Sequence, residues 1–190
     1  MALTPSNMLP LGTTISNFAL LNTISGKTEN WEDYKGNEGT LIIFMCNHCP
    51  YVVYLMDHLV RFTKANALKG IKTVAISSND VEKYPADGPE KMKNLATDKH
   101  FDFPYFLDAD QSIAKMMDAA CTPDFYLLNK DNALVYRGRY DQARPGNDIA
   151  ITGEDLQEAI NDLLANRSTP VQYPSMGCNI KWKTEDGFPS

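Results

Sequence analysis

The chain has 190 residues, enough for one domain whose hydrophobic core needs no disulfide bonds. Hydrophobic residues make up 43% and charged residues 22% of the sequence, and these shares argue against a disordered, collagen-like or coiled-coil protein. The formal net charge is -6 with no basic cluster, so neither a nucleic acid nor a membrane is an expected partner. No apolar stretch approaches the roughly 20 residues that a membrane-spanning helix needs.

Residues 1–21 show neither the positive segment nor the sustained apolar segment of a secretory signal, and we expect a cytoplasmic protein. Four cysteines, Cys46, Cys49, Cys121 and Cys178, are spread over the chain. In a reducing compartment such thiols are more often catalytic, metal-binding or inert than joined in structural disulfides. Their spacing therefore carries more information than their number.

The first part of the chain predicts a β-hairpin followed by a buried strand. Residues 1–16 have no apolar period and several turn-forming residues, so we expect an irregular lead-in. Two short runs, 18–21 and 28–31, flank a Ser-Gly-Lys turn and predict the hairpin. Residues 40–45 are strongly apolar and lie between turn residues, which is typical of a strand buried on both faces.

A helix is predicted directly after the sequence Cys-Asn-His-Cys-Pro at residues 46–50. Apolar residues recur near helical spacing from residue 53 to 63, and Gly70 is expected to close the helix. Residues 71–76 predict a second buried strand. Residues 80–90 are acidic and contain two prolines, and we expect a surface loop there.

The rest of the chain predicts three more helices and three more strands. They are expected at residues 90–99 (helix), 103–107 (strand), 112–120 (helix), 125–128 and 134–137 (two strands of a hairpin) and 152–164 (helix). Thr152 is the expected N-cap of the last helix. Periodicity is lost from residue 166 onward.

The order of these elements predicts the fold class. Alternating strands and helices indicate an α/β fold whose central sheet has a parallel core and is flanked by helices on both faces. The terminal strand–strand–helix unit makes this sheet mixed, and the β-hairpin precedes it. We expect one domain at residues 1–165, with residues 166–190 as a C-terminal tail packed on the same domain.

The pair Cys46 and Cys49 lies where a buried strand turns into a helix, and this position favours thiol chemistry. The first N–H groups of a helix lack partners within the helix and carry partial positive charge, which stabilises a thiolate. Cys46 comes first, so we expect it to be exposed and to be the attacking thiolate. Cys49 is expected to be shielded and to act as the resolving thiol. Pro50 fits in the first turn, where its missing N–H removes no helical bond.

The same pair is also half of what a closed zinc site requires. Such a site has four ligands, usually in two close pairs, whereas Cys121 and Cys178 stand alone. The redox interpretation is therefore favoured, and no metal is predicted. A non-enzymatic carrier of zinc or of a soft ion such as Cu(I) is the alternative from another class, with Cys46, Cys49 and His48 as ligands.

Three segments of the chain resemble a known family. They are residues 31–36 at the end of the hairpin, residues 40–50 with the cysteine pair, and residues 121–128 with a Thr-Pro element before a strand. On these grounds residues 18–164 are similar to thioredoxin-fold proteins of the redoxin branch. This branch includes the alkyl hydroperoxide reductase/thiol-specific antioxidant family and bacterial thiol–disulfide oxidoreductases. Within it the chain resembles a bacterial subgroup with a Cys-Asn-His-Cys-Pro-Tyr core and a Gly-Cys-x-Ile-Lys-Trp tail.

The resemblance implies a thioredoxin-like fold in which the Thr122–Pro123 bond is cis. In this family the loop faces the two cysteines and offers backbone groups to an extended substrate, so both residues are candidates for substrate binding. His48 occupies a slot that holds histidine in thiol oxidases and isomerases of this fold. An imidazole there stabilises the Cys46 thiolate and makes the disulfide more oxidising. Tyr51, directly after the motif, is a further candidate for lining the site.

Two departures from the family pattern bear on activity. Ordinary thioredoxins bury an acid six residues before the first cysteine, where this chain has Thr40, and some related reductases place one six residues after it, at Val52. The sequence thus shows no carboxylate to accept the proton of Cys49. The family's peroxidases have Thr or Ser three residues before the reactive cysteine and Pro seven before it. Ile43 and Gly39 stand there, so a thiol peroxidase is the weaker alternative.

The sequence therefore predicts a thiol–disulfide oxidoreductase that reduces or exchanges disulfides through Cys46 and Cys49. No organic cofactor is expected. The expected partners are protein or small-molecule disulfides and a thiol reductant. Cys121 and Cys178 are candidate auxiliary thiols, although a free cysteine most often serves as a small buried apolar residue.

Overall fold

A computed structural model describes residues 3–169 and 171–183 of the chain. Its central sheet has seven strands. From one edge to the other they are β3 (Lys27–Asn30), β2 (Ala19–Asn22), β6 (Tyr105–Leu107), β5 (Ile71–Ser77), β4 (Gly39–Phe44), β8 (Asp124–Asn129) and β9 (Leu134–Gly138). β4 and β6 run parallel to β5, and the remaining pairs are antiparallel. The predicted mixed sheet with a parallel core is confirmed, as is the hairpin of β2 and β3.

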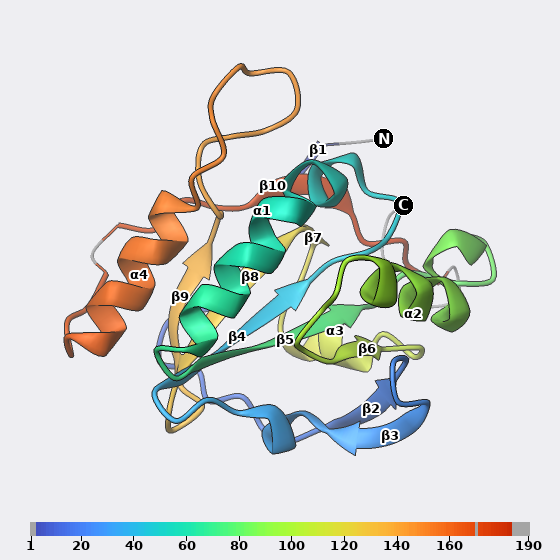
Figure 1. Cartoon of the computed structure of the whole chain (residues 1–190), viewed down its shortest axis with the longest axis horizontal. Coiled ribbons are helices and arrows are strands. Elements are labelled where there is room, and N and C mark those ends of the chain that lie inside the picture. Colours follow the sequence, from blue (N-terminus) through green and yellow to red (C-terminus); the bar gives the residue numbers. More distant parts are fainter. Residues whose placement is uncertain (1–2, 170, 184–190) are drawn as a thin grey trace.

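Helices cover both faces of this sheet, as predicted (Figure 1). On one face lie α1 (Pro50–Ala67), α2 (Pro89–Asp98) and α4 (Glu154–Leu164). The other face carries α3 (Ser112–Met116) and the short helix η1 (Trp31–Tyr34). Within the described residues, none of the helices combines the length and the apolar character needed to cross a bilayer.

The strand β4 is the centre of the sheet and is buried along its whole length. Leu41 and Ile43 join the apolar cluster under α1 and α4, whereas Ile42 and Phe44 join the cluster under α3. A strand that sends alternate side chains into two cores needs apolar residues at every position, which explains its unbroken apolar sequence. The cysteine motif follows directly after the end of β4.

A second, three-stranded sheet joins the two ends of the chain. β10 (Met176–Asn179) lies between β1 (Leu3–Pro5) and β7 (Cys121–Thr122) and is antiparallel to both. The expectation of an irregular lead-in is therefore wrong for residues 3–5. Strands this short carry too little sequence to show a period, and tertiary contact forms them. Residues 184–190 of the predicted tail lie outside the described residues.

The close approach of β10 to β7 depends on Gly177. A Cβ atom added there would lie 2.0 Å from the carbonyl oxygen of Thr122, which is far inside van der Waals contact. Further along the tail, the backbone carbonyl of Lys181 accepts the N–H of Asp80 at 2.8 Å. The tail thus packs against both the β7 strand and the segment after β5.

Two helix boundaries differ from the expectation. The N-cap of α4 is Gly153, with a φ of 68°, and not Thr152. The carboxylate of Asp141 accepts the backbone N–H groups of both residues, at 2.6 and 2.7 Å, so a loop side chain satisfies this helix end. α3 ends at Met116, four residues early, because Asp118 adopts a positive φ of 51° that a helix cannot continue through.

The segment at residues 80–90 is mostly an exposed loop, as its composition predicts, but two of its acidic residues point inward. It contains the short helix η2 (Pro85–Asp87). The side chains of Asp80 and Asp87 are both buried. A buried carboxylate requires polar partners. Two partners of the Asp87 carboxylate, Asn47 and His48, belong to the cysteine motif.

A buried ion pair anchors the start of β8, directly after Pro123. Asp124 and Arg137 are both enclosed, with 3.2 Å between Oδ2 and Nη2. The same carboxylate oxygen accepts the hydroxyl groups of Ser6 and Tyr126, at 3.1 Å each. The pair therefore fixes the chain where it leaves Pro123.

Removing the cation of this pair should strongly destabilise the protein. In Arg137→Met the Asp124 carboxyl stays buried without its partner, a change that costs about 3–5 kcal/mol. We expect the urea midpoint of unfolding to fall clearly. The matched control is Lys99→Met, which breaks the more exposed ion pair with Asp57 and should leave the midpoint almost unchanged. Equal midpoints for Arg137→Met and the parent protein would contradict the role of the buried pair.

Candidate active site

The cysteine motif occupies the turn between β4 and α1. β4 ends at Phe44 and α1 begins at Pro50, so Cys49 is the N-cap residue and Cys46 lies outside the helix. Pro50 takes the first helical position, where no N–H is needed. Both cysteines are buried, with exposed fractions of 1% for Cys46 and 0% for Cys49. The expectation that Cys46 is exposed is wrong, because neighbouring segments close over it.

The Thr122–Pro123 loop lies against the two cysteines, and its peptide bond is cis, as the resemblance implies. The hydroxyl oxygen of Thr122 lies 3.6 Å from Cys46 Sγ. The carbonyl oxygen of Thr122 lies 3.1 Å from Cys49 Sγ, a distance at which a protonated thiol donates to it. One residue of β7 therefore contacts both sulfurs of the motif.

Hydrogen-bond donors converge on the sulfur of Cys49. They are the Cys46 thiol, the Thr122 hydroxyl, the Cys178 thiol and the backbone N–H of Val52 in the first turn of α1. These donors, the Cys46 thiol first among them, lower the pKa of Cys49 to about 4, although burial opposes ionisation. The two sulfurs are coupled, so they lose their first proton as a pair and at a lower pH than an isolated thiol does.

The pKa of Cys46 is shifted in the opposite direction. Its hydrogen bond to Cys49, its burial and the nearby carboxylate of Asp87 all raise the pKa of Cys46. These directions are opposite to the expectation from sequence, in which Cys46 is the low-pKa thiol, while the assignment of Cys46 as the attacking thiol stays a prediction. The reason is that α1 begins at Pro50, which places Cys49 at the positive end of the helix and leaves Cys46 beside an acidic side chain.

Asp87 is the site residue that sequence reasoning missed. It is fully buried. Its Oδ1 accepts the backbone N–H of Asn47 at 2.8 Å, and its Oδ2 accepts the side-chain amide of Asn79 at 2.8 Å. The same Oδ2 lies 2.6 Å from Nδ1 of His48. No local pattern marks Asp87 among the other acids of its segment, because Asn47 stands 40 positions earlier in the chain.

The imidazole of His48 lies between this carboxylate and an aromatic ring. It stacks on Tyr84, with 5.5 Å between ring centroids and 5° between ring planes. Its side chain is 24% exposed, whereas that of Asp87 is fully enclosed. His48 is therefore the part of the motif that connects the buried thiols with solvent.

Cys46, His48 and Asp87 together form a group that can hold a metal ion. One donor atom from each residue lies within 4.8 Å of the other two. Thiolate, imidazole and carboxylate are the ligands of zinc sites, and three protein ligands leave a fourth position open. This group differs from the ligand set expected from sequence by containing Asp87 in place of Cys49.

The two remaining cysteines have different surroundings. Cys178 of β10 belongs to the same buried cluster as Cys46 and Cys49, and its thiol hydrogen-bonds to the Cys49 sulfur. Cys121 of β7 lies 3.9 Å from the backbone oxygen of Pro123 and 4.0 Å from that of Ser175. Of the two candidate auxiliary thiols, Cys178 therefore meets the cysteine pair directly.

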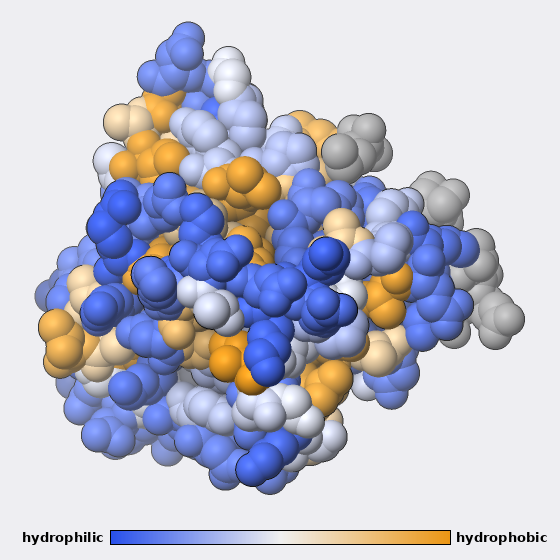
Figure 2. All heavy atoms as spheres, turned by 45° about the vertical axis from the view of Figure 1, so that its right-hand side comes forward, coloured by the Kyte–Doolittle hydropathy of each residue, from blue (hydrophilic) through white to orange (hydrophobic). Residues whose placement is uncertain are grey.

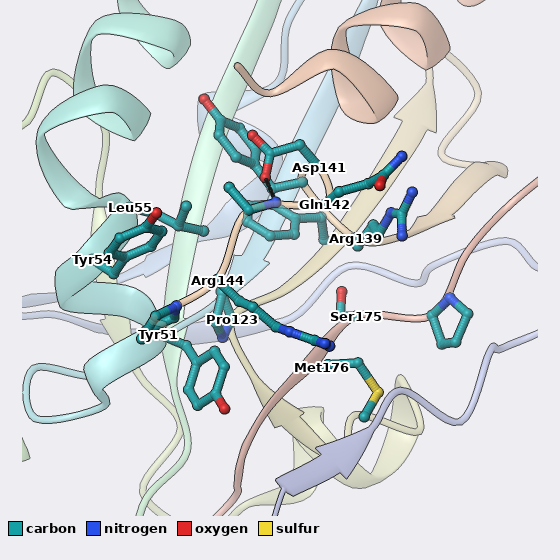
Figure 3. A pocket seen from close by; sticks show the side chains of 15 residues that line it. Tyr51, Tyr54, Leu55, Pro123, Arg139, Asp141, Gln142, Arg144, Ser175 and Met176 are labelled. Carbon is teal, nitrogen blue, oxygen red and sulfur yellow. Dashed lines mark hydrogen bonds between the residues drawn. The ribbon is translucent and has the colours of Figure 1, made fainter. Parts of the chain in front are cut away.

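A pocket opens beside Pro123, and Tyr51 of α1 lines it. Tyr140 and Arg144, in the segment after β9, form another wall, and Ser175 lies at its far side. Figure 3 shows the Arg144 side chain extending across the pocket toward Ser175. On a mostly hydrophilic face, apolar residues gather at the base of the projecting segment between β9 and α4 (Figure 2). The cis-proline loop thus borders a pocket that is lined by aromatic rings, by the guanidinium groups of Arg139 and Arg144 and by the carboxylate of Asp141.

Solved structures are similar to the whole chain. One is an uncharacterized conserved protein from Geobacillus kaustophilus, with 47% identity, a TM-score of 0.94, and coverage of 97% of this chain and 98% of that chain. Another is a hypothetical protein from Sinorhizobium meliloti 1021, with 39% identity, a TM-score of 0.91, and coverage of 95% and 99%. Peroxidoxin BcpB from Mycobacterium tuberculosis shares the fold, with 17% identity, a TM-score of 0.61, and coverage of 85% and 100%.

No curated protein matches the chain. The model of the Redoxin family matches residues 10–156, which is most of the sequence. The matched region contains the cysteine motif, Asp87 and the Thr122–Pro123 loop, and it ends before β10. The predicted thioredoxin-like fold is confirmed by this match and by the structure from Geobacillus kaustophilus. The chain belongs to the Redoxin family.

Proposed function

We propose that the chain is a thiol–disulfide oxidoreductase whose redox couple is Cys46 and Cys49. Members of the Redoxin family are typically thiol oxidoreductases. The observation that carries the proposal is that Thr122 of the cis-proline loop contacts both sulfurs of the Cys-x-x-C turn, at 3.6 Å from Cys46 and 3.1 Å from Cys49. Two thiols held against one residue at the start of a helix are placed to form a disulfide, and the coupled pair supplies a thiolate at neutral pH.

In the proposed reaction Cys46 attacks the substrate. Cys49 is enclosed by Thr122, Cys178 and α1, whereas Cys46 adjoins the partly exposed His48. The Cys46 thiol passes its proton to the His48–Asp87 pair, and its sulfur attacks one sulfur of the substrate disulfide. A mixed disulfide forms, and the other substrate sulfur leaves as a thiolate that takes up a proton.

The second step uses the charge already present on Cys49. Its thiolate attacks Cys46 Sγ of the mixed disulfide, which releases the second substrate thiol and leaves the Cys46–Cys49 disulfide. In this proposal the step needs no acid at the positions of Thr40 or Val52, because the hydrogen bonds that lower the pKa of Cys49 favour its thiolate. The absence of a family carboxylate there is thereby compensated by the donors around Cys49.

The proposed substrates are protein or small-molecule disulfides that bind beside the cis-proline loop. The wall formed by Tyr51, Tyr140 and Pro123 supports binding of an extended, partly apolar segment, and Arg144 supports an anionic group on it. A thiol reductant of a reducing compartment such as the cytoplasm would return the disulfide to two thiols. No cofactor takes part in this scheme.

A second candidate function is the binding of a zinc-type ion, which the donor group of Cys46, His48 and Asp87 favours. Metal binding would occupy the sulfur that the redox scheme uses as nucleophile. Elemental analysis of the purified protein separates the two proposals, because a stoichiometric metal that is lost in Asp87→Asn supports binding. A thiol peroxidase has less support, since Ile43 is a buried apolar residue of β4 where a peroxidase would place a hydroxyl group.

The first prediction concerns the two cysteines. Cys46→Ser should lose reduction of insulin disulfides by dithiothreitol completely, because it lacks the nucleophile. Cys49→Ser should still attack and should accumulate a mixed disulfide that mass spectrometry detects. Cys121→Ser is the matched control and should keep the parent activity. Full activity in either Cys46→Ser or Cys49→Ser would refute the two-thiol mechanism.

The second prediction concerns the ionisation of Cys49. Thiolate absorbance near 240 nm should persist in the reduced protein down to a midpoint near pH 4, because the folded-state pKa of Cys49 is lowered to about 4. Below that pH the thiolate is protonated and the absorbance disappears. Cys49→Ser should show no thiolate at neutral pH, since burial and the Asp87 carboxylate still raise the pKa of Cys46 when its interaction with Cys49 is removed. A midpoint near the ordinary thiol pKa of about 8.5 in the parent protein would show that the donors do not act as described.

The third prediction concerns Asp87. In the Cys49→Ser background, Asp87→Asn should lower the pKa of Cys46 by about one unit or more, because a nearby negative charge is removed. The pH dependence of alkylation by iodoacetamide measures this shift. Asp80→Asn is the control, since it removes a buried carboxylate from the same segment without facing Cys46. Identical pH profiles for the two substitutions would exclude an electrostatic role of Asp87.

A further inference from the structure

We propose that Cys178 is a third redox thiol, which exchanges with the Cys46–Cys49 disulfide and takes Cys49 into a Cys49–Cys178 disulfide. The proposal rests on the proposed function and deepens it, because it adds a second resolving residue to the same couple. It also explains why a buried thiol of the C-terminal tail lies against a reactive cysteine.

The first support is the position of Cys178 in the small sheet. In the pairing of β10 with β7, Cys178 stands opposite Thr122. The carbonyl oxygen of Thr122 lies 3.1 Å from Cys49 Sγ, so the strand next to Cys178 already contacts the sulfur in question. Cys178 is 3% exposed and shares its buried cluster with Cys46 and Cys49.

The second support is the packing of β10 against α1, whose N-cap residue is Cys49. The Cys178 and Cys49 thiols lie in one buried cluster, and each shifts the pKa of the other, as neighbouring sulfurs do. Cys49 therefore has a neighbouring sulfur on each side, Cys46 in the turn before α1 and Cys178 in β10.

The third support is that the tail holds Cys178 firmly in place. Gly177, directly before it, packs against the carbonyl oxygen of Thr122 with no room for a side chain. After it, the N–H of Ile180 donates to the backbone oxygen of Ala120 at 3.0 Å. The backbone on both sides of Cys178 is thus tied to the segment around β7.

The exchange balances without an external oxidant or reductant. The sulfur of Cys178 attacks Cys49 Sγ in the Cys46–Cys49 disulfide, so the bond between Cys49 and Cys178 forms while that between Cys46 and Cys49 breaks. The proton of Cys178 passes to the departing sulfur of Cys46. One disulfide and one thiol are present before and after the step. The product is an oxidised protein in which the nucleophile Cys46 is a free thiol again.

The exchange requires ionisation of the Cys178 thiol, which is disfavoured in the reduced protein and less disfavoured once the Cys46–Cys49 disulfide has formed. Burial and the hydrogen bond to Cys49 raise the pKa of Cys178 to about 12. When Cys49 is in a disulfide it carries no charge, so its share of this effect disappears. The exchange should therefore follow oxidation of the couple and should become faster as the pH rises.

The test uses variants that isolate the pair of Cys49 and Cys178. The full-length Cys46→Ser protein is oxidised with diamide, its free thiols are blocked with N-ethylmaleimide, and its peptides are analysed by mass spectrometry. We expect an internal Cys49–Cys178 disulfide. It should be lost in Cys46→Ser/Cys178→Ser and retained in Cys46→Ser/Cys121→Ser. The Cys121 variant is the matched control, because that cysteine is buried in the neighbouring strand but bonds to backbone oxygens.

The parent protein provides the second measurement. After limited oxidation it should contain both the Cys46–Cys49 and the Cys49–Cys178 disulfides, with Cys46 increasingly alkylated as the pH is raised. If the Cys46–Cys49 disulfide forms but Cys178 stays fully alkylatable in every variant, the exchange is refuted and the proposed function stands. If no Cys46–Cys49 disulfide forms in the parent protein, the proposed function itself fails.

Discussion

The rest of the site depends on the contacts that the backbone and side chain of Thr122 make. Its hydroxyl lies beside the Cys46 sulfur and its carbonyl beside the Cys49 sulfur, while its main chain pairs with Cys178. Its following peptide bond is the cis bond to Pro123. Three parts of the chain that are distant in sequence therefore meet at one residue. The absence of a side chain at Gly177 and the buried ion pair after Pro123 both serve to keep that residue in place.

The proton distribution in the cysteine pair follows from two charges of different origin. The start of α1 presents an N–H group to Cys49, and the buried Asp87 presents a carboxylate to the region of Cys46. Both effects favour ionisation of Cys49 over ionisation of Cys46. The partly exposed His48, paired with Asp87, lies beside Cys46. The position at which α1 begins therefore bears on how the two thiols differ.

The local features of the fold are readable in the sequence. The apolar run of β4, the Cys-x-x-C turn and the amphipathic α1 each depend on neighbouring residues, and the family resemblance supplies the cis-proline loop. The role of Asp87 could not be predicted from the sequence, because it depends on contacts with Asn47 and Asn79 that leave no periodic pattern in the sequence. The pKa order fails for a similar reason, since it turns on whether Cys46 or Cys49 caps the helix. The strand β10 could not be predicted from the sequence, because it is formed by pairing with segments that lie far away in the chain.

The small sheet of β1, β7 and β10 has a consequence for how the protein is made. Its strands come from the beginning, the middle and the far end of the described chain, so its closure brings together ends separated by a very long loop. Contacts of this kind form late, because loop closure must precede any gain from pairing. During synthesis the cysteine motif exists long before residues 176–179 arrive to pack against it. A segment that is translated long after Cys46 and Cys49 therefore completes the surroundings of their thiols.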